Sequence, residues 1–390
     1  MTALSAVLAV FVSPHGFGHA ARACAVMEAL SELNPKVRFE VFTTVSEAFF
    51  RESLGDGCFG YHRLRTDVGL VQTAPFAADL RATARALAGF FPFSPALIDS
   101  LSKRLGRLGC VGVLCDISPL GIAVARAAGV PSVLVENFTW DWIYEDFAGR
   151  CPDMAPFVSG LGRVFADAEI RIQAEPVCRP TEAALTVGPV GRKIRTRGSE
   201  VRSRLGVPAG RPMVLVSQGG IVGRPADLNR LSQRSDLFFV LTNAGVRGRL
   251  AANVLALDAL SGVYHPDLVG AADALIGKAG YSTIAEACRA GVPFGFRTWR
   301  DFREAAVLEE FILTRMGGIA LDPEGFDEGG WIDRIDALLD QPRRPVDALG
   351  AEEIAAFLEM KLAFSGAEKD RLNTGRGRTS NSERCTSNVE

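Results

Sequence analysis

Continuous apolar runs alternate with helical patterns along the first half of the chain. Leu4–Val12 is an apolar run of strand length, and Ala20–Leu33 after it carries apolar residues at helical spacing. Buried strands separated by helices predict a parallel sheet, because parallel strands cannot be joined by a tight hairpin. The further elements expected in this half are strands at Val37–Phe42, Val111–Cys115 and Ser132–Val135 and a helix at Gly121–Ala128.

The same alternation starts again after residue 210. Residues 187–200, between the two patterns, are rich in glycine and charge, and the last 25 residues are dominated by Ser, Thr, Asn, Arg and Gly. Two open α/β domains with a cleft between them are therefore predicted. Strands are expected at Pro212–Ser217, Leu237–Leu241, Ala274–Ile276 and Pro293–Phe296, and a helix at Ser282–Ala290. The expected order is an N-terminal domain 1–186, a linker 187–200, a C-terminal domain 201–345, a helix 346–365 and a disordered tail 366–390.

Composition leaves few classes of protein open. The chain has 390 residues, of which 48% are hydrophobic and 23% charged, with a formal net charge of −2, so it lacks the basic excess of a nucleic-acid-binding protein. Its 8 cysteines form no C-x-x-C pair, which predicts free thiols in a reducing compartment. No apolar stretch reaches the ~20 residues of a membrane span, and the N-terminal run lacks the features of a signal peptide. A cytoplasmic protein is expected, with contact to a membrane surface left open.

The loop after the first strand, residues 13–20, is the first candidate site. It combines two glycines with His15 and His19 and leads into a helix N-terminus, but it lacks the third glycine of a dinucleotide fingerprint. Asp116 follows a later buried strand. It is either a helix N-cap or the carboxylate that orients a general-base histidine. His19 is accordingly either that base or an ordinary loop histidine.

Aromatic and polar residues gather in a third loop, after the strand that ends at Val135. Asn137, Trp140 and Asp141 lie there among further aromatic and acidic groups. Such residues suit stacking on a sugar ring or closing a cleft, although packing between domains explains them equally well. Together with His15 they are the candidates for the acceptor side of a site.

The strand-to-helix loops of the second half predict an anion site. Glycines and small hydroxyl residues at a helix start leave backbone N–H groups free for a phosphate, and a lysine beside them adds a positive charge. A carboxylate one turn further on suits a ribose diol, although a plain capped helix with a solvated glutamate is the alternative. The candidates are Gly219, Gly220, Lys278, Gly280, Ser282 and Thr283 for a diphosphate and Glu286 for a ribose.

These stretches resemble the GT-B glycosyltransferases. Gly277–Glu286 with Gly291–Pro293 is similar to the donor signature of plant secondary-metabolite transferases and of the family 28 peptidoglycan N-acetylglucosaminyltransferase. The resemblance implies the diphosphate and ribose roles just named. It also implies that His19 deprotonates the acceptor hydroxyl and that Asp116 orients His19. The implied fold is GT-B: two Rossmann-like parallel-sheet domains facing across a cleft, the first for the acceptor and the second for the nucleotide sugar.

A closer likeness is to the N-terminal glycosyltransferase-like region of plant L-arabinokinases, over roughly residues 7–340. It rests on His15–Ala20, Asn137–Tyr144, Gly277–Tyr281 and Phe302–Glu304, in the same order along the chain. The kinase half of those proteins has no counterpart in this sequence. Arabinokinase activity is therefore not implied.

The donor-sugar contact departs from the family pattern. Arg300-Asp301 stands where an Asp/Glu–Gln pair is expected, so Asp301 and Glu304 are alternative contacts for the sugar. No D-x-D metal motif stands out, and no cofactor is implied. We therefore expect an inverting, metal-independent glycosyltransferase that takes a nucleotide sugar, a UDP-sugar, and an unknown acceptor. A non-catalytic nucleotide-sugar-binding module and a UDP-sugar epimerase on the same scaffold are the alternatives.

Overall fold

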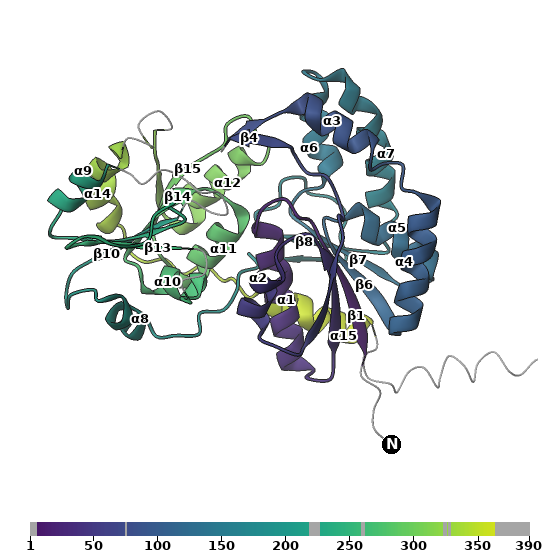
Figure 1. Ribbon diagram of the computed structural model, residues 1–390, viewed down its shortest axis with the longest axis horizontal. Coiled ribbons are helices and arrows are strands. Elements are labelled where there is room, and N and C mark those ends of the chain that lie inside the picture. Colours follow the sequence, from purple (N-terminus) through teal and green to yellow (C-terminus); the bar gives the residue numbers. More distant parts are fainter. Residues whose placement is uncertain are drawn as a thin grey trace, which may run out of the picture.

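The chain forms two large sheets, one in each half of the sequence (Figure 1). Each sheet has seven strands crossed by helices, which confirms the predicted α/β class. A small hairpin of β4 (Gln72–Ala74) and β5 (Ala77–Ala78) stands apart from both sheets. The computed structural model describes residues 6–74, 76–217, 227–258, 262–322, 326 and 329–362.

The N-terminal sheet is parallel throughout, in the order β3-β2-β1-β6-β7-β8-β9. Its interior strand β1 is apolar along its length because helices cover both faces of the sheet. The strands are β1 (Val7–Val12), β2 (Arg38–Thr43), β3 (Phe59–Arg63), β6 (Cys110–Asp116), β7 (Ser132–Glu136), β8 (Ile170–Ala174) and β9 (Leu185–Val187). The helices are α1 (Gly18–Leu33), α2 (Glu47–Leu54), α3 (Leu80–Ala88), α4 (Pro95–Leu108), α5 (Pro119–Ala128), α6 (Trp140–Ala148) and α7 (Ala155–Ala166).

The C-terminal sheet repeats this plan in the order β12-β13-β11-β10-β14-β15-β16. Its edge departs from the prediction, because β12 pairs antiparallel with β13. The strands are β10 (Met213–Ser217), β11 (Phe238–Thr242), β12 (Gly248–Ala251), β13 (Val254–Leu257), β14 (Ala274–Lys278), β15 (Phe294–Arg297) and β16 (Gly318–Ala320). The helices are α8 (Gly198–Leu205), α9 (Leu228–Gln233), α10 (His265–Ala271), α11 (Tyr281–Ala290), α12 (Ala305–Phe311) and α14 (Ile335–Leu339).

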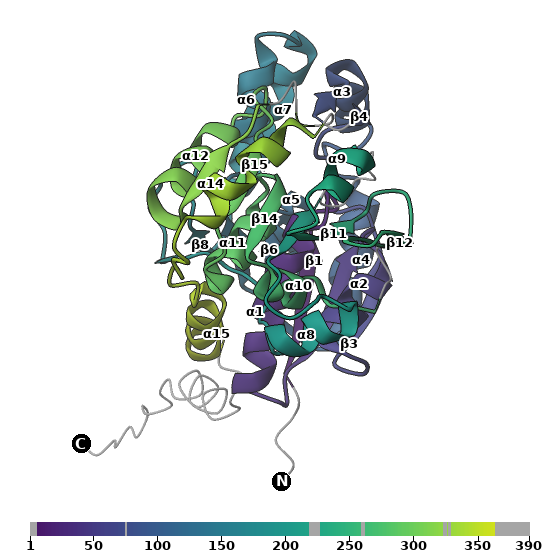
Figure 2. The same cartoon turned by 90° about the vertical axis from the view of Figure 1, so that its left-hand side faces the viewer.

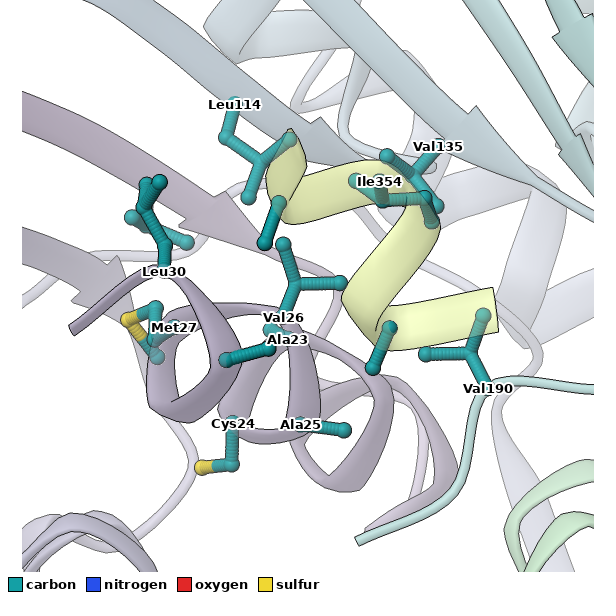
Figure 3. Packing of buried hydrophobic residues seen from close by; sticks show 14 of the residues in the cluster. Ala23, Cys24, Ala25, Val26, Met27, Leu30, Leu114, Val135, Val190 and Ile354 are labelled. Carbon is teal, nitrogen blue, oxygen red and sulfur yellow. The ribbon is translucent and has the colours of Figure 1, made fainter. Parts of the chain in front are cut away.

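The last described helix, α15 (Gly350–Lys361), returns to the N-terminal half. It lies beside α1 in both views of the molecule (Figure 1, Figure 2). Ile354 packs into the same cluster as Val26 and Leu30 of α1 and Val190 of the linker (Figure 3). The predicted C-terminal helix thus belongs to the N-terminal core, although it follows the C-terminal sheet in sequence.

The two halves meet in a region that we call the junction. On one side of it Tyr281 and Ala285 of α11 join the apolar cluster built around α1. On another side Trp299 and Phe302 of the C-terminal half join the second N-terminal cluster. Apolar side chains from both halves therefore enclose the polar groups at the junction.

Some predictions fall outside these observations. Gly219, Gly220 and the tail 366–390 lie outside the described residues. Among the helices that the structure describes, none combines the length and apolar character needed to cross a membrane.

Candidate functional site

His19 and Asp116 come together although they are 97 positions apart. His19 lies in the first turn of α1 and Asp116 ends β6, and parallel pairing of β1 with β6 puts both at one edge of the sheet. His19 Nδ1 lies 2.8 Å from Asp116 Oδ1. Because an ionised carboxylate only accepts hydrogen bonds, Nδ1 carries the hydrogen and Nε2 keeps its lone pair. No hydrogen bond found within the described part of the chain involves Nε2.

Arg22, which no sequence motif marked, completes this pair. Its Nε donates to Asp116 Oδ2 at 2.7 Å and its Nη2 donates to Asp116 Oδ1 at 2.7 Å. The guanidinium also lies 4.7 Å from the ring centre of Tyr281, a residue of the C-terminal half. The available signal was a single arginine three positions after His19, on a helix that is otherwise apolar over this stretch.

Burial and charge set the proton state of the pair. Burial alone would raise the pKa of Asp116, but the charge and hydrogen bonds of Arg22 and the hydrogen bond from His19 hold this pKa below its ordinary value. Burial also lowers the pKa of His19. The hydrogen bond and charge of Asp116 oppose that effect, and the charge of Arg22 adds to it. His19 is therefore neutral near pH 7, as a general base must be.

The backbone is strained directly after Asp116. Ile117 has a φ of 41°, in the left-handed region that a β-branched residue rarely adopts. Its side chain is fully buried, and its N–H donates to Val135 O at 3.3 Å, so packing on β7 holds this conformation. Strain of this kind is typical of functional sites. Here it follows directly on the carboxylate that binds His19.

His15 and Trp140 line the space beside His19. The ring centre of Trp140 lies 5.0 Å from that of His15 and 6.5 Å from that of His19. Gly69, with a φ of 63°, permits this arrangement, because a Cβ there would lie 2.7 Å from His15 Nδ1. Burial, with the electrostatic effects of His19 and Lys278, lowers the pKa of His15 to about 3. His15 is therefore a neutral polar group beside His19.

A second buried acid lies behind these rings. Asp67 is 2% exposed, and its Oδ2 accepts the hydrogen of Trp140 Nε1 at 3.0 Å. Its Oδ1 has no hydrogen-bond partner within the described residues. Burial raises the pKa of Asp67 to about 7, against hydrogen bonds from Ser13 and Trp140. No sequence motif marks this carboxylate as a site residue, because its burial depends on the tertiary fold.

Asn137 connects the pair to the C-terminal half. Its Oδ1 accepts from Arg22 Nη1 at 2.8 Å, and its Nδ2 donates to Glu304 Oε1 at 2.7 Å. Glu304, directly before α12, is 8% exposed. Of the two alternatives for a donor-sugar contact, Glu304 is the one that the structure places at the junction.

Two predicted site residues lie apart from the others. The side chain of Asp301 is 72% exposed and lies 3.7 Å from Arg150, because the next residue takes the buried position in this turn. Asp141 points toward α7, where a Cβ at Gly162 would lie 3.4 Å from it, and it pairs with Arg179 at 3.6 Å. Neither carboxylate takes part in the hydrogen-bond network around His19.

The first turn of α11 lies open at the junction. Gly280 is its N-cap and provides no side-chain cap, so the first N–H groups of the helix have no side-chain acceptor there. A Cβ at Gly18 would lie 3.8 Å from Ser282 Oγ, so the N-termini of α1 and α11 approach one another. Thr283 is 9% exposed in the same turn. Two helix N-termini that converge favour a bound anion.

Lys278 adds a positive charge next to this helix start. Its Nζ lies 5.5 Å from the ring centre of Phe76 and 5.6 Å from that of Trp299. Phe76 comes from the β4–β5 hairpin of the N-terminal half, so both halves cover the lysine. Burial lowers the pKa of Lys278, and the charge of Glu304 opposes this effect. A partly desolvated ammonium group is stabilised by an anionic ligand.

Glu286, the candidate ribose ligand, is already engaged on both oxygens. Arg192 Nε donates to Oε1 at 2.8 Å, and His265 Nδ1 lies 2.7 Å from Oε2. His265 Nε2 in turn lies 3.1 Å from Ser217 Oγ at the end of β10. Arg192 and His265 are site residues that the sequence did not indicate.

Among the residues that the structure describes, no group of three or more His, Cys, Asp or Glu side chains is placed to hold a metal ion. Metal independence stays a prediction.

Solved structures share this architecture over nearly the whole chain. The calicheamicin glycosyltransferase CalG4 matches with a TM-score of 0.57 at 16% identity, over 95% of this chain and 99% of its own. The Arabidopsis thaliana protein UGT89C1, solved with quercetin, matches with a TM-score of 0.59 at 16% identity, over 94% of this chain and 98% of its own. The glycotransferase of kitacinnamycin matches with a TM-score of 0.61 at 17% identity, over 92% of this chain and 99% of its own. The chain has the GT-B fold.

The chain is also similar in sequence to a curated protein. The L-arabinokinase of Arabidopsis thaliana is 25% identical over 378 residues, which cover 95% of this chain and 36% of that protein. The chain therefore spans about a third of the length of this relative, and the predicted likeness to it is confirmed. No protein-family model matches the chain.

Within the GT-B fold, most of the candidate residues meet at the junction. His19, Asp116, His15, Trp140 and Asn137 come from the N-terminal half. From the C-terminal half come Lys278, Gly280, Ser282, Thr283, Glu286 and Glu304.

Proposed function

We propose that this protein transfers a sugar from a nucleotide sugar to a hydroxyl group of an acceptor, with inversion and without a metal ion. One observation carries the proposal. A neutral histidine with a free Nε2 lies at the start of α1, and the uncapped N-terminus of α11 approaches that same helix start. A base for the acceptor and a positive site for a leaving diphosphate thus face each other.

The reaction follows from this placement. His19 Nε2 takes the proton of the acceptor hydroxyl while its oxygen attacks the anomeric carbon of the donor. The bond from that carbon to the diphosphate oxygen breaks, and its electron pair leaves with the diphosphate. In an in-line attack the acceptor oxygen and the departing diphosphate lie on opposite sides of the anomeric carbon, so the single displacement would invert its configuration. General-base help of this kind is worth about 10²–10⁴-fold in rate.

Developing charge on the diphosphate needs compensation. The N–H groups at the start of α11, the hydroxyls of Ser282 and Thr283 and the ammonium group of Lys278 supply it. Preorganised donors of this kind stabilise a transition state without reorganisation cost. These groups would do the work of the divalent metal that other transferases use.

The choice of UDP rests on neighbours of the same fold. One was solved in complex with UDP and is titled a UDP-glucose:anthocyanidin 3-O-glucosyltransferase, and UGT89C1 was also solved with UDP-L-rhamnose. UGT89C1 was solved with quercetin as well, a molecule with several hydroxyl groups. We assign a UDP-sugar donor and a hydroxyl acceptor to this chain on that basis.

Thermal shifts across a panel of nucleotides and nucleotide sugars test the proposal. A ligand at 100 times its Kd stabilises the native state by about 2.7 kcal/mol, so a selective rise of the unfolding midpoint identifies the donor. We expect UDP and one UDP-sugar to give the largest shifts. The stabilising sugar is then incubated with hydroxyl acceptors, and the products are followed by mass spectrometry. Binding without transfer or hydrolysis would support the binding module, and isomerisation without an acceptor would support the epimerase.

A further inference from the structure

Arg22 is in direct contact with both members of the candidate catalytic pair. Its Nη2 lies 2.7 Å from Asp116 Oδ1 and 3.4 Å from His19 Nδ1. Nδ1 already donates its hydrogen to Asp116, so the approach of Nη2 to Nδ1 is not a hydrogen bond and acts through charge. The side chains of Arg22 and Asp116 are 1% and 2% exposed, so water screens this charge little.

The charge of Arg22 changes how readily a histidine–aspartate pair takes up a proton. Without a cation, the carboxylate would favour a protonated imidazole and draw a proton onto the pair. Arg22 binds both carboxylate oxygens, so the charge of Asp116 is compensated before His19 is protonated. His19 then gains less from becoming an imidazolium. The lone pair on Nε2 stays available at lower pH than in an isolated pair.

The other groups that face His19 do not replace this effect. His15 lies in the preceding loop, and its pKa of about 3 keeps it neutral. Phe138 and Trp140 present uncharged rings at 6.0 Å and 6.5 Å. Tyr281 of α11, beneath Arg22, has its pKa raised by burial to about 12 and is neutral as well. The ionised groups of the network nearest the base are therefore Asp116 and Arg22, with Glu304 further along it through Asn137.

Arg22 also ties the pair to the C-terminal half. Its Nη1 donates to Asn137, which donates to Glu304, and its guanidinium covers the ring of Tyr281. The position of the base thus depends on groups from both halves.

We infer that Arg22 is a positioning residue of the proposed transfer reaction, which neutralises Asp116 so that His19 remains an uncharged base and which fixes the pair against the C-terminal half. The inference rests on the proposed function for its catalytic meaning. The proton state of His19 can be measured without any activity, so the two claims can fail separately.

Nitrogen-15 NMR of histidine-labelled wild-type protein gives the first test. The chain has 4 histidines, so the spectrum is simple, and the signal lost in His19→Gln assigns His19. We expect the neutral form with hydrogen on Nδ1 to persist as the pH falls from 7.5 through the ordinary histidine pKa of about 6.5. A His19 signal that titrates with a midpoint at about pH 6.5 or higher would overturn the inference.

Kinetics of Arg22 variants give the second test. In Arg22→Met the pair takes up a proton at higher pH, whichever partner carries it, so the acid limb of the kcat/KM profile should move up by about one pH unit or more. Arg22→Lys keeps the charge but loses the two-pronged contact. We expect its acid limb within about 0.5 pH unit of wild type and kcat lower by up to about 10²-fold.

Arg126→Met is the matched control, because Arg126 lies on the surface with its side chain 75% exposed and pairs only with Asp167 in the described structure. Its pH profile should equal that of wild type. If Arg22→Met moves the acid limb no further than this control does, the inference is wrong. If Arg22→Met fails to fold, the NMR titration of the wild type and the profile of Arg22→Lys decide.

Discussion

Two glycines near the end of β14 allow the stability of the C-terminal half and its binding of the donor to be tested separately. Gly277 lies within the strand, where a Cβ would lie 2.2 Å from Ser217 O of the neighbouring strand. Restoring an ordinary C···O separation of ~3.3 Å would move the strands apart by about 1 Å. The obstacle is backbone at the centre of the sheet and cannot rotate away. We expect Gly277→Ala to cost about 3 kcal/mol or more.

Gly280, three positions later, presents the opposite situation. No heavy atom lies within 4 Å of a Cβ built there, and its φ of −133° is open to alanine. Gly280→Ala should therefore change the free energy of unfolding by no more than about 0.5 kcal/mol. The new methyl group projects into the open space at the uncapped helix start, where the proposal places the diphosphate. We expect it to weaken donor binding at least ~10-fold, or ~1.4 kcal/mol.

The assay combines the unfolding midpoint in urea with calorimetric titration of UDP on both variants. Gly277→Ala should lower the midpoint strongly, whereas Gly280→Ala should keep the wild-type midpoint and lose affinity. A stable Gly280→Ala variant with wild-type affinity for UDP and for the UDP-sugar would refute the placement of the diphosphate at α11.

Three further predictions concern buried charges. Asp116→Asn leaves Arg22 buried without its counter-charge and should lower the free energy of unfolding at pH 7 by about 3–5 kcal/mol. Most of this loss should be recovered in the double variant with Arg22→Met. Urea unfolding of the wild type, the two single variants and the double variant checks this, and additive losses would contradict it. The pKa of His15 is lowered to about 3 in the folded state, so the unfolded chain binds more protons and the protein loses stability as pH falls below about 6.5. His15→Gln should make this decline shallower between pH 6.5 and 5. Urea unfolding at several pH values checks this. The pKa of Asp67 is raised to about 7, so the folded protein loses stability at this residue as pH rises from about 4 to about 7 and the buried carboxyl ionises. Asp67→Asn should therefore raise the thermal midpoint more at pH 8 than at pH 5. An equal change at both pH values would contradict the shift.

The fold was predictable because its central strands are buried on both faces. Such strands are continuous apolar runs, as in VLAVFV of β1 and MVLVS of β10, and these are visible in one sequence. Edge strands were missed for the converse reason. β3 reads FGYHR and is half-buried, so its polar positions break the apolar run.

The candidate site was predictable as far as topology determines it. Loops after parallel strands meet at one edge of a sheet, so His19 and Asp116 could each be placed at that edge. Their contact was implied only by the resemblance to the GT-B glycosyltransferases. The pairing of Arg192 with Glu286 could not be predicted. The two residues are 94 positions apart, and either side chain alone is typical of a solvated surface charge. The return of α15 to the N-terminal core was hidden for a similar reason. Its partners lie in the first 30 residues and at the linker.

The central claim is that His19 is the base of a sugar transfer whose donor is held by the other half of the protein. The most direct measurement compares UDP binding and sugar transfer in wild type and in His19→Ala. The account predicts unchanged affinity for UDP and a rate of transfer lower by about 10²–10⁴-fold. Transfer at the wild-type rate in His19→Ala would contradict the account.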